Sequence, residues 1–168
     1  MQFAKDSFYV ALRDRLGIVN PSRTVAVNGA TRPAVLVVEN EPATATPLLA
    51  NAFHLEWTSL AGALGQDSAK RSLLALSCSI RYGTSGTLDG GVDRGRVMAA
   101  LDRELLEICS PGRTTKLDYT QTTPADLGSN VIWTKPQLKP VETDRKTGML
   151  LVRNAELTVF FFPEVNLP

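Results

Sequence analysis

The strand patterns of this chain follow one another directly instead of alternating with helices, and this order limits the possible folds more than any other feature. One helical pattern covers residues 6–16, four strand patterns follow, and a second helical pattern covers residues 92–109. A last strand pattern covers residues 149–162. Doubly wound parallel folds need a helix after each strand. We therefore predict an α+β fold, in which two helices pack on one face of a mixed or antiparallel sheet of about four to five strands.

The two helical patterns each have one apolar stripe and a clear end. Phe8, Leu12 and Leu16 lie four residues apart, and Gly17 can end the first helix. The stripe of the second helix is formed by Val97, Leu101, Leu105 and Ile108. These stripes predict amphipathic helices that cover one side of the sheet.

The first strand patterns predict a hairpin and then a half-buried strand. Residues 24–27 and 33–39 are rich in β-formers, and Asn28-Gly29 lies between them as a turn signal. Residues 53–57 alternate, so Phe53, Leu55 and Trp57 are expected to point inward. We expect residues 58–69 to form a connection.

Two longer strands are predicted on either side of the second helix. Residues 70–82 alternate between an apolar face and a small, polar face; the apolar face consists of Leu74, Leu76, Cys78, Ile80 and Tyr82. In residues 149–162 the alternation fails near Arg153-Asn154, which predicts a β-bulge there.

The segment between the second helix and the last strand, residues 113–146, is called the arm below. It is too long for a loop inside a compact domain and too apolar for a disordered linker. We predict one domain over residues 1–168 with the arm as an extended insertion or β-hairpin, its pieces at 116–121 and 131–134. Whether the arm packs on its own domain or on a neighbour is left open. The residues expected at a subunit interface are Trp133, Leu138, Phe160 and Phe162.

Composition leaves little material for catalysis or metal binding. The chain has one histidine, His54, and two cysteines, Cys78 and Cys109, which we expect to be reduced and buried. This excludes Cys/His zinc fingers and multi-histidine metal sites, and no cofactor is expected. Lys and Arg total 18 and Asp and Glu total 17, a net charge of +1, which argues against direct nucleic-acid binding.

Three local patterns have both a chemical and a structural interpretation. His54 and Glu56 share one strand face, as a His–carboxylate pair or as an ordinary surface pair. The glycine-rich link at residues 83–91 lacks the phosphate-loop motifs, and Asp89 and Asp93 would repel a phosphate there. Basic residues gather at four places but are diluted by acidic neighbours, so we expect a solvated surface: Lys70-Arg71, Arg94 and Arg96, Lys135 and Lys139, and Arg145-Lys146.

No segment is expected to enter a membrane. The N-terminus lacks the apolar stretch of a secretory signal, and the longest apolar runs are far shorter than the ~20 residues that span a bilayer. We therefore expect a cytoplasmic protein.

Four segments resemble the tail terminator and neck (head–tail joining) proteins of tailed bacteriophages. They are the short early helix at residues 7–16, the strand at residues 72–82 with its Ser-Ile-Arg-Tyr end, the helix start Gly-Val-Asp-Arg-Gly-Arg-Val-Met-Ala-Ala-Leu-Asp-Arg-Glu-Leu at residues 91–105, and the strand Arg-Asn-Ala-Glu-Leu-Thr-Val-Phe at residues 153–160.

This resemblance implies a structural protein without catalytic residues. It implies a homo-hexameric ring at the head-proximal end of a tail tube, with tail tube and neck proteins as partners. Such a protein would be cytoplasmic during assembly and part of the virion or tail-like particle afterwards. The alternative is a small ligand-binding α+β module, or an unrecognised enzyme, with a pocket near His54 and Trp57.

Overall fold

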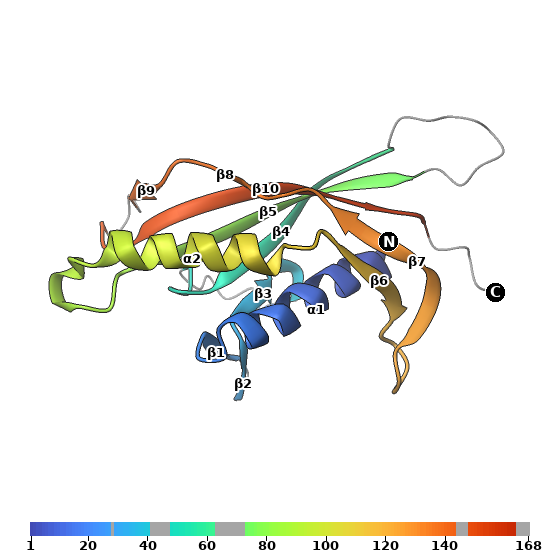
Figure 1. Ribbon diagram of the computed structural model, residues 1–168, viewed down its shortest axis with the longest axis horizontal. Helices are drawn as coiled ribbons and strands as arrows, with labels where there is room; N and C mark the ends of the chain where they lie inside the picture. Colours follow the sequence, from blue (N-terminus) through green and yellow to red (C-terminus); the bar gives the residue numbers. More distant parts are fainter. Residues whose placement is uncertain (28, 41–47, 63–72, 144–147, 164–168) are drawn as a thin grey trace.

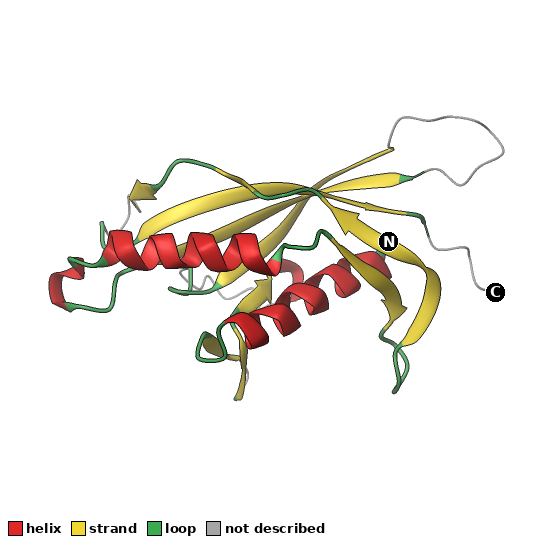
Figure 2. Ribbon diagram, in the orientation of Figure 1, coloured by secondary structure: helices red, strands yellow, loops and turns green. Residues whose placement is uncertain are grey.

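The computed structural model describes residues 1–27, 29–40, 48–62, 73–143 and 148–163, and arranges them in two layers. One layer is an eight-stranded sheet, and the other contains the helices α1 (Gln2–Val19) and α2 (Arg94–Ile108), both on the same side of the sheet (Figures 1 and 2). This confirms the α+β fold and the placement of two helices on one face. Neither helix is long and apolar enough to cross a membrane, within the part of the chain that is described.

The sheet contains more strands than predicted and is mixed. Its path runs β3-β4-β5-β10-β7-β6, with β8 and β9 also paired to β10. β3 and β4 are parallel, and the other pairs are antiparallel. The strand bounds are β3 Val35–Val37, β4 Phe53–Gly62, β5 Leu74–Thr84, β6 Arg113–Asp118, β7 Ala125–Trp133, β8 Gln137–Leu138, β9 Glu142–Thr143 and β10 Leu151–Phe161. Short 3₁₀ turns lie at η1 (Val38–Asn40) and η2 (Asp89–Gly91).

The centre of the sheet is the antiparallel ladder of β5 and β10. It runs without a break from Leu151 opposite Thr84 to Phe161 opposite Leu74. The predicted apolar face of β5 is turned toward the helices, with Leu76, Cys78 and Ile80 at most 3% exposed. The central ladder thus supplies the surface on which α2 packs, whereas α1 packs mainly against β6 and β3.

Phe8 of α1 joins two distant parts of the sheet. Its ring meets Trp57 of β4 edge-on at 5.6 Å and Trp133 of β7 edge-on at 5.1 Å between centroids. Such edge-to-face pairs are favoured by the ring quadrupoles. The α1 stripe predicted from the sequence therefore fixes the helix across the sheet, and Leu12 and Leu16 are also fully buried.

The hairpin partner predicted near the N-terminus was wrong. β1 (Thr24–Val27) pairs with β2 (Ala30–Pro33), not with residues 33–39, and the two form a separate sheet. Val35–Val37 instead forms β3, which is buried beside β4. The predicted turn falls partly on residue 28, outside the described residues.

Two predicted boundaries were also too narrow. α1 begins at Gln2 rather than near residue 6, and β4 continues to Gly62 rather than ending at Trp57. The alternation of β4 breaks at a bulge between Trp57 and Ser59, and the exposed residues beyond it gave no apolar signal. The rest of the expected connection, residues 63–69, lies outside the described residues.

The β-bulge predicted at Arg153-Asn154 was wrong, because Arg153 occupies an inward position of a regular strand. Arg153 lies opposite Tyr82 in the ladder, and its Nε is 3.2 Å from Asp102 Oδ1 on α2. The Tyr82 hydroxyl donates to the same carboxylate oxygen at 2.7 Å. Burial and the Asp102 carboxylate raise the pKa of Tyr82. Because Arg153 is charged, the sequence shows no apolar residue at this inward position, and the alternation of β10 therefore looked interrupted.

The arm folds back onto its own chain. β6 and β7 form an antiparallel hairpin that joins the sheet where Trp133 lies opposite Val159 of β10, and β8 and β9 then run along the rest of β10. The hairpin also packs beside α1, where Ser7 Oγ accepts a hydrogen bond of 2.9 Å from the main-chain N–H of Leu117. The hairpin pieces predicted at 116–121 and 131–134 overlap β6 and β7. Both strands begin earlier in the sequence than predicted, at Arg113 and at Ala125.

Candidate functional site

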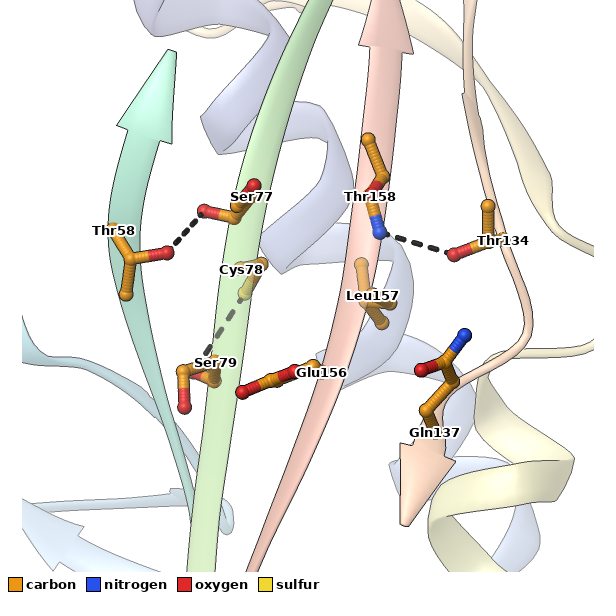
Figure 3. Close-up of a pocket in the computed structure, with 9 residues that line it drawn as sticks. All are labelled: Thr58, Ser77, Cys78, Ser79, Thr134, Gln137, Glu156, Leu157 and Thr158. Atoms are coloured by element: carbon orange, nitrogen blue, oxygen red, sulfur yellow. Dashed lines mark hydrogen bonds between the residues drawn. The ribbon is translucent and has the colours of Figure 1, made fainter. Parts of the chain in front are cut away.

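The outer face of the eight-stranded sheet is the side turned away from α1 and α2, and no described helix covers it (Figures 2 and 3). The register aligns outward side chains of the arm, β10, β5 and β4 into rows that run across the strands. These rows change from apolar to hydroxyl-bearing to charged along the strand direction. Antiparallel sheets commonly bury one face and expose the other. The outer face is therefore the surface on which we look for a functional site.

The first row, called the apolar row below, consists of Ile132, Phe160, Ala75 and Ala61. Ile132 is 51% exposed, and Phe160 lies outside the buried core cluster. Phe162, the next outward position after Phe160, is 42% exposed. Four strands therefore present one continuous apolar line to the surroundings.

The next two rows are polar. The second row contains Thr134, Thr158, Ser77 and Ser59, and the third contains Gln137, Glu156, Ser79 and Glu56. They border a hollow of about 510 Å³, called the polar hollow below (Figure 3). Its lining residues are Thr58, Ser77, Cys78, Ser79, Thr134, Gln137, Glu156, Leu157 and Thr158.

The hydroxyl groups of the polar hollow bond to the main chain and to one another. Thr134 donates from its N–H to Thr158 O at 3.0 Å and accepts from the Thr158 N–H through Oγ1, also at 3.0 Å. Ser59 Oγ donates to Ser77 Oγ at 3.0 Å. The carboxylate in the lining, Glu156, lies 2.6 Å from Lys139 Nζ. No imidazole is among the lining residues, and Glu156, which lies opposite Ser79 in the ladder, is the titratable carboxylate of the hollow.

The two thiols are buried and free, as predicted. Cys78 is 1% exposed and Cys109 is 4% exposed. Burial raises the pKa of Cys78, and it raises the pKa of Cys109 to about 12. Both thiols are therefore protonated at neutral pH, so neither supplies the thiolate that a nucleophile needs. Within the described ranges, no group of three or more His, Cys, Asp or Glu side chains could hold a metal ion.

The structure separates His54 from Trp57 and places neither in the lining of the polar hollow. His54 is on the outer face opposite Arg81, with Nε2 3.3 Å from Leu49 O. Trp57 points to the inner face, where Lys5 Nζ lies 5.5 Å from its ring. His54 and Glu56 do share the outer face, as predicted, but a pocket between His54 and Trp57 would have to reach through the sheet. The ligand-binding alternative stays a prediction.

The predicted basic clusters are spread over separate surfaces. Arg94 Nη1 donates to Gly148 O at 3.2 Å and to Met149 O at 3.1 Å, which ties α2 to the start of β10. Lys139 is paired with Glu156. Lys70, Arg71, Arg145 and Lys146 lie outside the described residues.

The glycine-rich link before α2 is organised around the Asp93 carboxylate. The Asp93 carboxylate accepts hydrogen bonds from the main-chain N–H groups of Thr87 and Leu88, at distances from 3.0 to 3.1 Å. Gly86 has a φ of +86°, and a Cβ there would collide with this carboxylate. Asp93 thus orders the link from the N-cap position of α2.

These hydrogen bonds predict a pH-dependent contribution to stability. The Thr87 hydroxyl, together with the two N–H groups, lowers the pKa of Asp93 from 3.8 to about 2. Because the folded-state pKa is depressed, the contribution is complete above about pH 4 and is lost as the pH falls to about 2. The difference in melting temperature between the wild type and Asp93→Asn, followed by circular dichroism, should therefore shrink over this range. Asp89→Asn, an exposed change in the same link, is the control; a difference that is constant with pH would contradict the assignment.

The four predicted interface residues fall into two groups. Trp133 is 4% exposed in the core, and Leu138 packs partly buried against the same core. Phe160 lies in the apolar row and Phe162 is exposed beside it. The interface role of all four stays a prediction, and Phe160 and Phe162 are the two on which a neighbour could pack directly. Ile132 was not among the predicted interface residues. Once β7 is known to be a strand, its position next to the inward-pointing Trp133 shows that it faces outward.

Comparison with protein-family models and with the sequences of curated proteins finds no match to this chain.

Proposed function

We propose that this chain is a non-catalytic structural subunit of the tail-terminator or neck type, which assembles with copies of itself as a ring at the head–tail junction of a phage or prophage tail. The observation that carries the proposal is the apolar row on the uncovered face of the sheet. Contiguous exposed apolar surface is typical of sites that bind a protein, a membrane or a ligand.

The position of the apolar row favours a protein partner over a small molecule. It is a line across four strands, with Ile132 and Phe162 exposed at its arm end. Small ligands bind in concave sites that enclose them, whereas a row on a sheet face is covered by a second surface of similar extent. In the proposed assembly, the row is covered by a neighbouring copy, and the tail tube and neck proteins bind the rims of the ring.

A lysine in the apolar row should prevent assembly without unfolding the subunit. Ile132→Lys places a charge where the interface would be desolvated, so light scattering should detect only monomer for this variant. The wild type should form a species of several subunits at high concentration or with the tail tube protein encoded in the same genome. Electron microscopy of that species should show rings.

The matched control is Ile18→Lys, the same substitution at an α1 position that is 81% exposed and far from the outer face. It should assemble as the wild type does. If Ile132→Lys assembled as Ile18→Lys does, the apolar row would not be part of the interface. A wild type that stays monomeric at all concentrations, and also with the tube protein, would contradict the proposed function itself.

A further inference from the structure

Free strand edges are unevenly distributed over the molecule. The edge of β6 is covered by α1 through Ser7 and Leu117. β3 is short and wholly buried, and β2 has Arg32 and ends at Pro33, which has no N–H to donate. Among the described strands longer than two residues, the remaining edges without a strand partner are those of β1, of the far half of β4, and of β7 from Ala125 to Val131, which carries the charged Asp126.

The far half of β4 is an open edge that carries neither charge nor proline, although the β-bulge between Trp57 and Ser59 lies at its start. β3 pairs only with Phe53–Leu55 of β4, and the chain then leaves the sheet at η1. From Thr58 to Gly62, β4 is exposed and pairs on its β5 side. This stretch contains no charged residue and no proline, and Leu60 is 51% exposed. Natural proteins often protect exposed edges with charged residues or prolines. An edge that lacks both is suited to accept another strand.

The free edge of β1 has the same character and lies elsewhere on the molecule. β1 pairs on one side with β2, and its residues from Thr24 to Val27 include no charge and no proline. The β1–β2 hairpin lies beside α1, whereas the far end of β4 projects from the opposite end of the sheet (Figure 1). Ala26 of β1 and Ala61 of β4 are both exposed.

We propose that β1 of one copy adds to the free edge of β4 in the next copy, so that the eight-stranded sheet continues into the neighbour's hairpin. This inference rests on the proposed ring and names the contact that would build it. Strand addition is driven mainly by main-chain hydrogen bonds, which explains why neither edge needs charged side chains. Val25 and Val27 pack against the core of their own copy, so the added strand would bring the edge of that apolar face next to the exposed Leu60 of the neighbour.

The two edges belong to different strands, so the contact is heterologous. In an open row of subunits, a contact of this kind leaves a free β1 edge at one end and a free β4 edge at the other. The row closes into a ring when a full turn is a whole multiple of the rotation between neighbouring subunits. It also continues the apolar row, which ends at Ala61 on β4. The neighbour's hairpin would therefore lie at the end of the row that the proposed function requires to be covered.

Cross-linking between two variants, each with one added cysteine, tests the contact. Ala26→Cys and Ala61→Cys each introduce an exposed thiol, while Cys78 and Cys109 are buried and should not react. A mixture of the two variants treated with a short bis-maleimide should give covalent dimers on a denaturing gel, and neither variant alone should. The double variant should give a ladder that ends at the number of subunits in the ring.

The outcomes separate this inference from the proposed function. Dimers from Ala61→Cys alone would mean that β4 pairs with its own counterpart, and this would overturn the inference. An assembly seen by light scattering that shows no cross-link in the mixture would also overturn it and leave the proposed function standing. A wild type without any assembly would overturn both.

A second variant checks the result without cysteines. Ala61→Lys places on the β4 edge the residue that most often protects edges, so it should abolish assembly while the melting temperature stays near that of the wild type. Ala99→Lys, the same substitution at an exposed position of α2, is the control and should assemble normally. Normal assembly of Ala61→Lys would exclude the β4 edge from the contact.

Discussion

Replacing Trp133 by alanine should lower the free energy of unfolding of the monomer by about 3–5 kcal/mol, the range for large aromatic residues in cores. Trp133 is 4% exposed, its ring packs on Phe8, and its Nε1–H donates to Cys109 O at 2.9 Å. Arg15 lies 5.2 Å above the same ring. The substitution leaves a cavity and an unpaired main-chain carbonyl at the point where the arm joins the core. Urea denaturation followed by far-UV circular dichroism measures the loss.

Two variants make this result specific. Trp133→Phe keeps most of the ring and removes the hydrogen bond, so it should cost only about 1 kcal/mol. Ile132→Ala changes the neighbouring residue on the outer face and should alter monomer stability by less than about 0.5 kcal/mol. If Trp133→Ala left the monomer as stable as the wild type and only weakened assembly, Trp133 would be an interface residue and its packing in the core would be refuted.

Replacing Glu104 by alanine should destabilise the protein by about 3–5 kcal/mol, because it leaves a buried cation without its partner. The Glu104 and Arg23 side chains are 8% and 13% exposed and form an ion pair. Arg23 Nη2 donates to Glu104 Oε1 at 3.0 Å, and Asn20 Nδ2 donates to the same oxygen at 2.7 Å. This network connects α2 to the end of α1 and to the start of β1. The expected drop in melting temperature is roughly 6–20 °C for a chain of this size.

The control for Glu104→Ala is Glu107→Ala, the same change at an exposed position of α2. It should move the melting temperature by no more than about 2 °C. Glu104→Gln keeps an acceptor for Asn20 and should fall between the wild type and Glu104→Ala. Equal effects of the two alanine variants would show that the buried ion pair contributes nothing specific.

Local patterns predicted the parts of this fold that depend on local periodicity. The α2 stripe is confirmed at Leu101, Leu105 and Ile108, which are fully buried. The alternation of β5 and the α+β order are also confirmed. These features follow from the 3.6-residue and two-residue periods, which are fixed by backbone geometry.

The features that could not be predicted depend on which segments meet in space. The inward Arg153 looked like a bulge because its partner Asp102 lies on another element. The chain beyond Trp57 looked like a connection because its side chains are small and exposed. Trp133 looked like surplus apolar surface until Phe8 and the main chain of Cys109 were found beside it.

The candidate site was predicted only in part for the same reason. Phe160 was selected from three consecutive phenylalanines, which already implied that both faces of the strand end are apolar. The apolar row appears only when the register of four strands is known, since Ala75 and Ala61 have no distinctive signal of their own. A row across strands is a property of pairing, and a single sequence does not show pairing.

The two sides of β10 are held differently, and this affects which part of the sheet opens first. On one side β10 is joined to β5 along its whole length, and on the other it is joined to β7 only at Val159 and Phe160, with Thr134 extending the attachment by one residue. The β6–β7 hairpin is therefore held to the rest of the fold mainly by side-chain packing, through the buried Val131 and Trp133 and the contact of Leu117 with Ser7 of α1, whereas the β5–β10 ladder is also held by main-chain hydrogen bonds along its whole length. Main-chain amides of the hairpin would exchange with solvent long before those of the ladder, which would remain as the last closed part of the sheet.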